Sequence, residues 1–203
     1  MRIFPFLFPR YTWHKPKQDK VIYLTFDDGP IPEVTEWVLD MLRQHQVKAT
    51  FFCIGDNISK HPVIFQRILA EQHQIGNHTF HHLKGWKTEI RDYIADVEQC
   101  QQEIVKHAKA TTSLFRPPYG KITKKQANYI LDKGYEIIMW SILTKDYSST
   151  ISPERCLART IRQLVPGSII VFHDSLKAEK NMKYTLPLLI EYLKKEGYFF
   201  ATL

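Results

Sequence analysis

The chain has 203 residues, which is enough for one sizeable hydrophobic core and short for two. Hydrophobic residues make up 44% and charged residues 24% of the sequence, a composition that excludes a disordered chain and favours a globular protein. The formal net charge is +7, but the lysines are scattered and no nucleic-acid-binding motif accompanies them, so we expect no nucleic-acid partner.

The cysteines and the N-terminus limit the classes further. Cys53, Cys100 and Cys156 are far apart and odd in number, without a CxxC spacing, and so predict buried, reduced thiols. The opening stretch "MRIFPFLFPR" is too short to span a bilayer, and no small-residue cleavage site follows it, so neither a transmembrane segment nor a convincing signal peptide is expected. We expect residues 1–19 to form an arm that packs on the domain. The compartment, cytoplasmic or envelope-associated, stays open.

Strand-like and helix-like segments alternate along the rest of the chain. Runs of apolar, strand-forming residues predict strands at 21–26, 49–55, 74–76, 113–116, 135–140, 168–172 and 198–203. Apolar residues at helical spacing, together with capping signals, predict helices at 33–44, 61–72, 90–104 after a Thr88 cap, 123–134, 152–163 and 183–195.

Repeated strand–helix units predict parallel strands with helices outside them. About seven such units fit an α/β fold of the distorted (β/α) barrel type, and a flat doubly wound sheet is the alternative. Neither an internal repeat nor a low-complexity tract or linker divides the chain, so we expect residues 20–203 to form one domain.

Polar clusters follow directly after predicted strands at several places in the sequence. Because the carboxyl ends of parallel strands share one rim of the fold, these clusters are expected to meet there and form a site. The clusters are Asp27-Asp28, "NHTFHH" (77–82), "RPPYG" (116–120) and His173-Asp174.

The "HTFHH" cluster and the two adjacent aspartates together indicate a metal site. His78 and His82 are spaced i, i+4, and on a helix they would share one face and converge on one ion. Two imidazoles and one carboxylate suit zinc, while cobalt, nickel or iron also fit such ligands. Neighbouring residues that leave a strand point in different directions, so one aspartate of the pair can ligate while the other acts as a base. Capping or surface roles are the alternative reading of these residues.

Two further clusters carry groups that could take part in hydrolysis. Arg116 can pair with a carboxylate of the site, and the rigid prolines after it can aim a backbone N–H, that of Tyr119, at a developing oxyanion. A histidine such as His173 ordinarily has a pKa near neutrality, which suits a group that donates a proton to a leaving group. The alternatives are a proline turn with a surface arginine, and a buried histidine bonded to backbone.

In this order the motifs resemble those of the polysaccharide deacetylases with the NodB homology domain, carbohydrate esterase family 4. The resemblance covers roughly residue 20 to the C-terminus and rests on "TFDDGP" (25–30), "HTFHH" (78–82), "RPPYG" (116–120), "WSILTKDY" (140–147) and "VFHD" (171–174). It implies a distorted (β/α) barrel with a divalent metal, usually zinc. It implies metal ligands at Asp28, His78 and His82, a general base at Asp27, a general acid at His173, an oxyanion-stabilising amide at Tyr119 and an arginine at Arg116 that organises the charged network.

The fourth motif departs from the family pattern. Leu143 takes the first of two acidic places, Asp146 keeps the second, and Tyr147 replaces a tryptophan. The carboxylate that tunes His173 could therefore be Asp146 or Asp174, each a candidate for indirect support of the site.

The activity implied by the resemblance is metal-dependent removal of acetyl groups from N-acetylated sugars of a peptidoglycan-like or chitin-like glycan. The alternatives are hydrolysis of O-acetyl esters on a xylan-like glycan, and a catalytically inactive relative that binds glycan without turnover. The departure in the fourth motif is the only support for the inactive alternative. The sequence leaves the acceptor glycan and the oligomeric state open.

Overall fold

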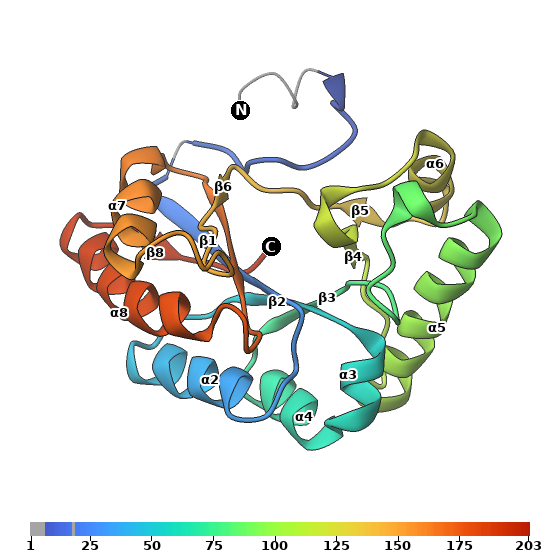
Figure 1. Ribbon diagram of the computed structural model, residues 1–203, viewed down its shortest axis with the longest axis horizontal. Coiled ribbons are helices and arrows are strands. Elements are labelled where there is room, and N and C mark those ends of the chain that lie inside the picture. Colours follow the sequence, from blue (N-terminus) through green and yellow to red (C-terminus); the bar gives the residue numbers. More distant parts are fainter. Residues whose placement is uncertain (1–6, 18) are drawn as a thin grey trace.

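A curled half-barrel of parallel strands forms the centre of the computed structural model, which describes residues 7–17 and 19–203 (Figure 1). Across the sheet the strands are β5 (Glu136–Ile137), β4 (Leu114–Phe115), β3 (Gln74–Asn77), β2 (Thr50–Cys53), β1 (Val21–Asp27), β7 (Ile169–His173) and β6 (Ile142–Leu143). A further strand, β8 (Phe199–Phe200), pairs in parallel with the start of β1. The expectation of about seven parallel strands in a distorted barrel is confirmed, and the flat doubly wound alternative is not.

Helices surround this sheet, with α5 and α6 on one side of the view and α7 and α8 on the other (Figure 1). Short 3-10 turns, η1 (Gly85–Lys87) and η2 (Pro118–Gly120), lie in the loops after β3 and β4. The α-helices are α2 (Val34–Gln44), α3 (Gly55–Lys60), α4 (Pro62–Ala70), α5 (Ile90–Ala108), α6 (Lys124–Asp132), α7 (Pro153–Gln163) and α8 (Glu179–Lys195).

Side-chain caps begin two helices where the sequence predicted them. Before α6, the Thr123 hydroxyl accepts a hydrogen bond from the Gln126 N–H, and the Gln126 side chain accepts one from the Thr123 N–H. Before α7, the Ser152 hydroxyl accepts from the Arg155 N–H, with Pro153 in the first turn.

Several expected boundaries are wrong, each for a local reason. Helix α8 begins at Glu179 rather than at residue 183, because the buried Asn181 side chain donates to the carbonyls of the 146–151 loop and holds this polar first turn. The strand expected at residues 135–140 is shorter in the structure, where it is β5. The two-residue strand β6 and the six-residue helix α3 were not predicted, because both are too short to show a periodic pattern. Helix α5 follows Glu89, whereas Thr88 ends η1.

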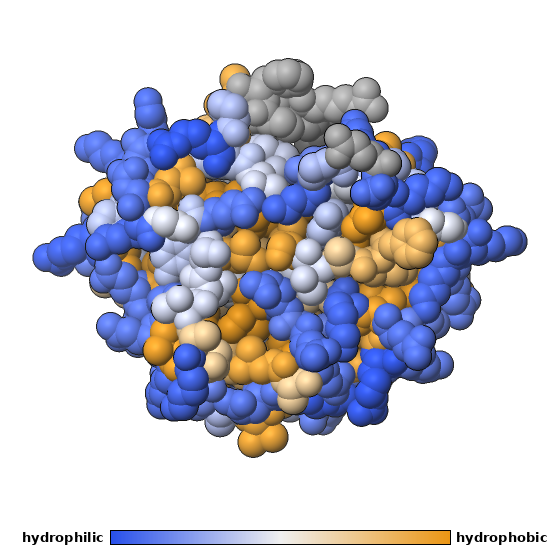
Figure 2. Space-filling view, turned by 180° about the vertical axis from the view of Figure 1, so that it is seen from behind, coloured by the Kyte–Doolittle hydropathy of each residue, from blue (hydrophilic) through white to orange (hydrophobic). Residues whose placement is uncertain are grey.

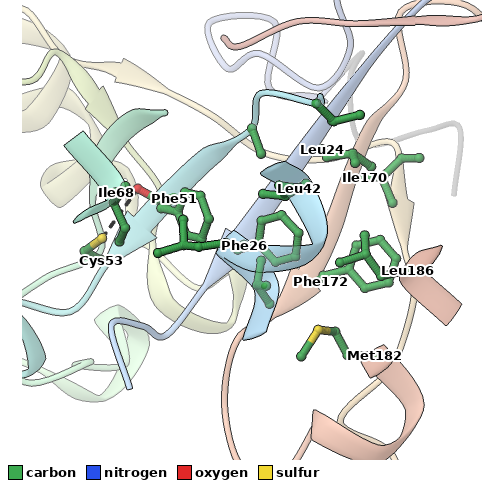
Figure 3. Close-up of a cluster of buried hydrophobic side chains, with 14 of the residues drawn as sticks. Leu24, Phe26, Leu42, Phe51, Cys53, Ile68, Ile170, Phe172, Met182 and Leu186 are labelled. Atoms are coloured by element: carbon green, nitrogen blue, oxygen red, sulfur yellow. Dashed lines mark hydrogen bonds between the residues drawn. The ribbon is translucent and has the colours of Figure 1, made fainter. Parts of the chain in front are cut away.

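The strands alternate between an apolar outer face and a partly polar inner face. On β1, Ile22, Leu24 and Phe26 belong to the main core under the outer helices. Figure 3 shows Phe26 beside Phe51 and Phe172, whose ring centroids lie 5.1 and 5.8 Å from that of Phe26. The residues of β1 that alternate with Ile22, Leu24 and Phe26 therefore face the inside of the half-barrel. The last of these inward-facing residues is Asp27, which belongs to the first polar cluster.

The arm expected at residues 1–19 lies partly outside the described residues, which omit 1–6 and 18. In its described part, the Thr12 N–H donates to the Ile137 carbonyl, and the Thr12 carbonyl accepts from the Met139 N–H. Further along, the Lys15 N–H donates to the Gly167 carbonyl, just before β7. These bonds tie the described arm to the domain.

The thiols and the surface complete the description. All three cysteines are buried and free of disulfides, as the sequence predicted. Among the described helices, not one combines the length and the apolar character that crossing a membrane requires. Seen from behind, the molecule is hydrophilic around its periphery, and hydrophobic residues show toward the middle of the face (Figure 2).

Candidate active site

A cavity of about 500 Å³ opens at the carboxyl ends of the strands, where the sequence placed the polar clusters. Its walls come from the end of β1, the loops after β3 and β4, the segment around β6 and the loop after β7. Of the candidate residues, it is lined by Asp27, Asp28, His78, His82, Tyr119 and His173. The fold therefore brings these side chains together, although they are distant in the sequence.

Asp28, His78 and His82 form a group whose ligand atoms all lie within 4.8 Å of one another. The Asp28 Oδ1 atom is 3.3 Å from His82 Nε2 and 3.8 Å from His78 Nε2. The His78 Nδ1–H donates to the Arg116 carbonyl at 2.7 Å, which leaves the Nε2 lone pair for the cavity.

The charge states of this group suit a cation. Burial lowers the pKa of His78 to about 3 and that of His82 below its ordinary value, so both imidazoles are neutral near pH 7. Burial also raises the pKa of Asp28, because a carboxylate with so little solvent needs a compensating positive charge. Two neutral imidazoles and one carboxylate match the donor set of a divalent transition-metal ion.

The histidines do not converge through a helix, and the helical reading of residues 78–82 is wrong. The segment leaves β3 as an irregular loop in which Thr79 and His82 have positive φ angles of 63° and 56°. Asn77 holds this loop, since its side-chain carbonyl accepts from the Thr79 N–H while its amide donates to Val97. An irregular loop with positive φ angles, rather than helical spacing, therefore places both imidazoles beside Asp28.

A buried acid that the sequence analysis missed also organises this loop. Asp96, on α5, accepts hydrogen bonds at Oδ2 from the N–H groups of Phe80 and His81, at 2.7 and 3.0 Å. Its Oδ1 accepts from His81 Nδ1 at 2.6 Å. The sequence signal is weak, because one aspartate in a helix otherwise reads as a solvated polar position. His81, the remaining histidine of the "HTFHH" cluster, faces Asp96 rather than the group of Asp28, His78 and His82.

Arg116 is fully buried and holds Asp27 in place. Its Nη1 donates to Asp27 Oδ1 at 2.6 Å and to the Thr25 hydroxyl at 2.7 Å, and the rest of the guanidinium donates to the backbone carbonyls of residues 138 and 139. Burial favours the neutral form of Asp27, but the positive charge and the hydrogen bond of Arg116, together with the neighbouring His173, outweigh it. The pKa of Asp27 therefore lies below its usual value, and this carboxylate is ionised.

Tyr119 borders the cavity on the His82 side. It follows two prolines and has a positive φ of 59°, and the next residue, Gly120, has a φ of 64°. A Cβ on Gly120 would meet the Trp140 ring at 2.8 Å, so only glycine fits this turn. The backbone around Tyr119 is therefore rigid, while its ring lies 4.6 Å from that of His82.

Asp146 is the carboxylate that faces His173. Its Oδ1 accepts from His173 Nδ1 and its Oδ2 from the His173 N–H, both at 2.7 Å, and the carboxylate is completely buried. Burial alone would lower the pKa of His173, but the carboxylates of Asp146, Asp28 and Asp27, with Asp146 foremost, together outweigh it and raise that pKa to about 9. The ring of Tyr147 meets His173 edge-on at 4.9 Å. His173 thus keeps a second proton, on Nε2, near pH 7.

Asp174, the other candidate for this partnership, has a different position, so that part of the expectation is wrong. It accepts from the Gly29 N–H at 3.0 Å and from the Thr35 hydroxyl at 2.6 Å. Burial raises its pKa to about 8. It points away from His173 because successive side chains on an extended segment face opposite sides. Asp174 supports the turn after β1 instead.

Comparisons with known proteins agree on one family. Residues 14–138 match the family described as polysaccharide deacetylase. A peptidoglycan-N-acetylglucosamine deacetylase of Bacillus cereus is 34% identical over 193 residues, covering 94% of this chain and 90% of that protein. A chitooligosaccharide deacetylase of a Bradyrhizobium species is 32% identical over 161 residues, covering 75% of this chain and 70% of that protein.

A solved structure extends the similarity to the whole fold. The crystal structure of the Bc1960 peptidoglycan N-acetylglucosamine deacetylase, in complex with an N-hydroxybenzamide compound, superposes with a TM-score of 0.93 at 33% sequence identity. The match covers 98% of this chain and 94% of that one. Fold and sequence therefore agree along almost the entire length.

Proposed function

The chain belongs to the polysaccharide deacetylase family and is a carbohydrate deacetylase, and we propose that it hydrolyses the N-acetyl groups of amino sugars in a peptidoglycan-like or chitin-like glycan. One observation carries this proposal. An ionised acid, Asp27, and a protonated histidine, His173, border the same cavity as the cation-binding group. A base, an acid and a cation site in one cavity are the parts that amide hydrolysis requires.

Asp28, His78 and His82 are the residues that would hold a divalent ion. Their donor types favour zinc, and cobalt, nickel or iron would fit the same set. When bound, such an ion supplies a polarising charge for the acetyl carbonyl and lowers the pKa of a water molecule toward neutrality.

Asp27 has the position and the charge of the general base. Because Arg116 occupies one of its oxygens, Oδ1, the other is left to accept a proton from the attacking water. The water oxygen forms a bond to the acetyl carbon, and the Tyr119 N–H is proposed to donate to the oxygen that becomes negative.

His173 has the charge state of the general acid. Its Nδ1–H is engaged by Asp146, so the proton that it can deliver is the one on Nε2. When the carbon–nitrogen bond breaks, the electron pair stays on the nitrogen and takes this proton. The products are acetate and the free amino sugar.

Acetate release from a panel of acetylated glycans, measured with and without a chelator, tests the proposal. The panel comprises peptidoglycan fragments, chitin oligomers and acetylated xylan. We expect release from the N-acetylated substrates, and its loss on chelation. Release from acetylated xylan alone would make the chain an ester hydrolase, and binding without any release would make it an inactive relative.

A further inference from the structure

A series of contacts leads outward from the cation-binding group along the His82 side of the cavity. The Tyr119 ring, which contacts His82, is 58% exposed, and the Lys84 ammonium lies 5.6 Å from its centroid. Next to it, the Lys121 ammonium lies 4.0 Å from the centre of the Trp86 ring, which is 60% exposed. Two exposed aromatic rings, each with a lysine, therefore extend the cavity over the protein surface.

The Trp86 ring is fixed although it is exposed. Its indole N–H donates to the Ile122 carbonyl at 3.0 Å, and η1, which carries it, is joined to the loop after β4 by a hydrogen bond from the Gly85 N–H to the Lys121 carbonyl at 3.1 Å. A large aromatic side chain held in this way offers apolar area at little entropic cost on binding. One face of a sugar ring is made of C–H groups and suits such a platform.

A similar pair lies on the His173 side of the cavity. The ring of Tyr147, which contacts His173, has the Lys177 ammonium 5.8 Å from its centroid, and both residues line the cavity. Lys84 on one side and Lys177 on the other therefore flank the place where an acetyl group would react.

These lysines lack acidic partners within the part of the chain that the structure describes. Other lysines form ion pairs with carboxylates, for example Lys60 with Asp56 and Lys183 with Glu179. Among the described interactions, the ammonium groups of Lys84, Lys121 and Lys177 contact only aromatic rings. Their positive charge is therefore available to a ligand.

We propose that this surface, formed by Trp86, Tyr119 and Tyr147 with Lys84, Lys121 and Lys177, selects an N-acetylated glycan strand that carries carboxylates beside its sugar rings over a neutral one. The inference rests on the proposed function and adds the substrate class. Sugar rings lie on the exposed aromatic rings, and carboxylates on either side of the reacting sugar contact the lysines.

The test compares three oligomers of equal length. The first is a neutral N-acetylglucosamine oligomer, the second alternates N-acetylglucosamine with N-acetylmuramic acid and has free carboxylates, and the third is the second with its carboxylates amidated. The zinc-loaded chain is assayed for kcat/KM by acetate release and for Kd by calorimetry. We expect the free-carboxylate oligomer to be preferred to its amidated form, and the preference to shrink as salt is added.

Variants connect this preference to the named side chains. Lys84→Gln and Lys177→Gln should each lower the free-to-amidated ratio about fivefold, and Lys125→Gln, an exposed lysine on α6, should leave it unchanged. Trp86→Ala should raise the KM of both forms by a similar factor. Thermal unfolding of each variant shows that the fold is retained.

The outcomes separate the two proposals. If the parent chain binds or cleaves the free and amidated oligomers equally, or if the lysine variants leave the ratio unchanged, the charge-selective surface is excluded even though acetate is released. If the parent chain releases acetate from none of the oligomers, the proposed function fails, and the ratio of Kd values still decides whether the surface selects carboxylates.

Discussion

Asp27 and His173 are register partners on the adjacent parallel strands β1 and β7. The register runs from Tyr23 opposite Ile169 to this last pair, so both side chains leave the sheet at the same level. The pairing explains how a proposed base and a proposed acid reach one cavity from positions far apart in the sequence. Side chains alternate between the two faces of each strand, and this alternation places Asp27 and His173 on the same, inward face of the sheet.

Asp27→Asn should reduce acetate release by about a hundredfold or more, the typical contribution of a general base. The amide keeps an oxygen for the Arg116 Nη1–H but cannot accept a proton from water. Zinc content, measured by elemental analysis, should stay near that of the parent chain. Asp132→Asn, an exposed position at the end of α6, is the matched control, and turnover within a few-fold of the parent in Asp27→Asn would contradict the assigned role.

His82→Ala should weaken zinc binding at least tenfold, because one of three donors is lost. Calorimetric titration of the chelator-treated chain measures this directly. His45→Ala, a half-buried histidine remote from the cavity at the end of α2, provides the control. Equal zinc affinity for the parent and His82→Ala would exclude the three-residue ligand set.

Asp146→Asn should move the alkaline limb of kcat/KM to lower pH. Asp146 is the foremost of the carboxylates that together raise the pKa of His173 to about 9, so its removal should let burial of the imidazole lower that pKa. Since the acid must be protonated to act, the variant should lose activity at a lower pH than the parent. An unchanged limb in a pH–rate profile would contradict the pairing.

The same ion pair predicts how stability depends on pH. The folded-state pKa of His173 is above its ordinary value of 6.5, so its contribution to stability is fully present below about pH 6.5 and is lost as the pH rises through about 9. Urea unfolding of the metal-free chain at pH 6 and pH 9.5 should show a larger loss in the parent than in Asp146→Asn. Losses of equal size would show that the pair does not contribute.

The sequence alone predicted the parts of the fold and site that rest on periodic patterns or compact motifs. Strands β1, β2 and β7 were predicted from their runs of strand-forming residues, and the polar clusters at the ends of β1 and β7 were correctly expected at one rim. Strand β6 was not predicted, because a strand of two residues is too short to show a periodic hydrophobic pattern. The sequence did not show whether Asp146 or Asp174 faces His173. That depends on the direction in which each side chain points, and a shift of one residue along an extended segment reverses this direction.

Other features depended on contacts that sequence spacing does not reveal. The i, i+4 spacing of His78 and His82 suggested a helix, whereas a turn with positive φ angles brings them together. Asp96 supports that turn from a helix that follows it in the sequence, and the lysine–aromatic pairs join separate loops. Such long-range contacts are fixed by tertiary packing and leave no local signal.

Asp96→Asn should weaken zinc binding by about ten- to a hundredfold without removing a ligand. The amide can keep one acceptor oxygen, but its NH₂ group cannot accept the bonds that the second carboxylate oxygen receives from the loop. Glu98→Gln, at an exposed position of α5 two residues further along, should leave zinc affinity unchanged. Similar zinc affinity in Asp96→Asn and the parent would show that the loop holds its shape without this carboxylate.

Gly29→Ala should destabilise the turn after β1 by about 1–3 kcal/mol, because the added Cβ would overlap the Asp174 carboxylate. Asp174→Ala also costs stability, since it leaves the Gly29 N–H and the Thr35 hydroxyl without their acceptor. The overlap disappears in the double variant, so Gly29→Ala should cost less in the Asp174→Ala background than in the parent. A double-mutant cycle on unfolding free energies measures the coupling, and strictly additive costs would mean that the two residues do not restrain each other.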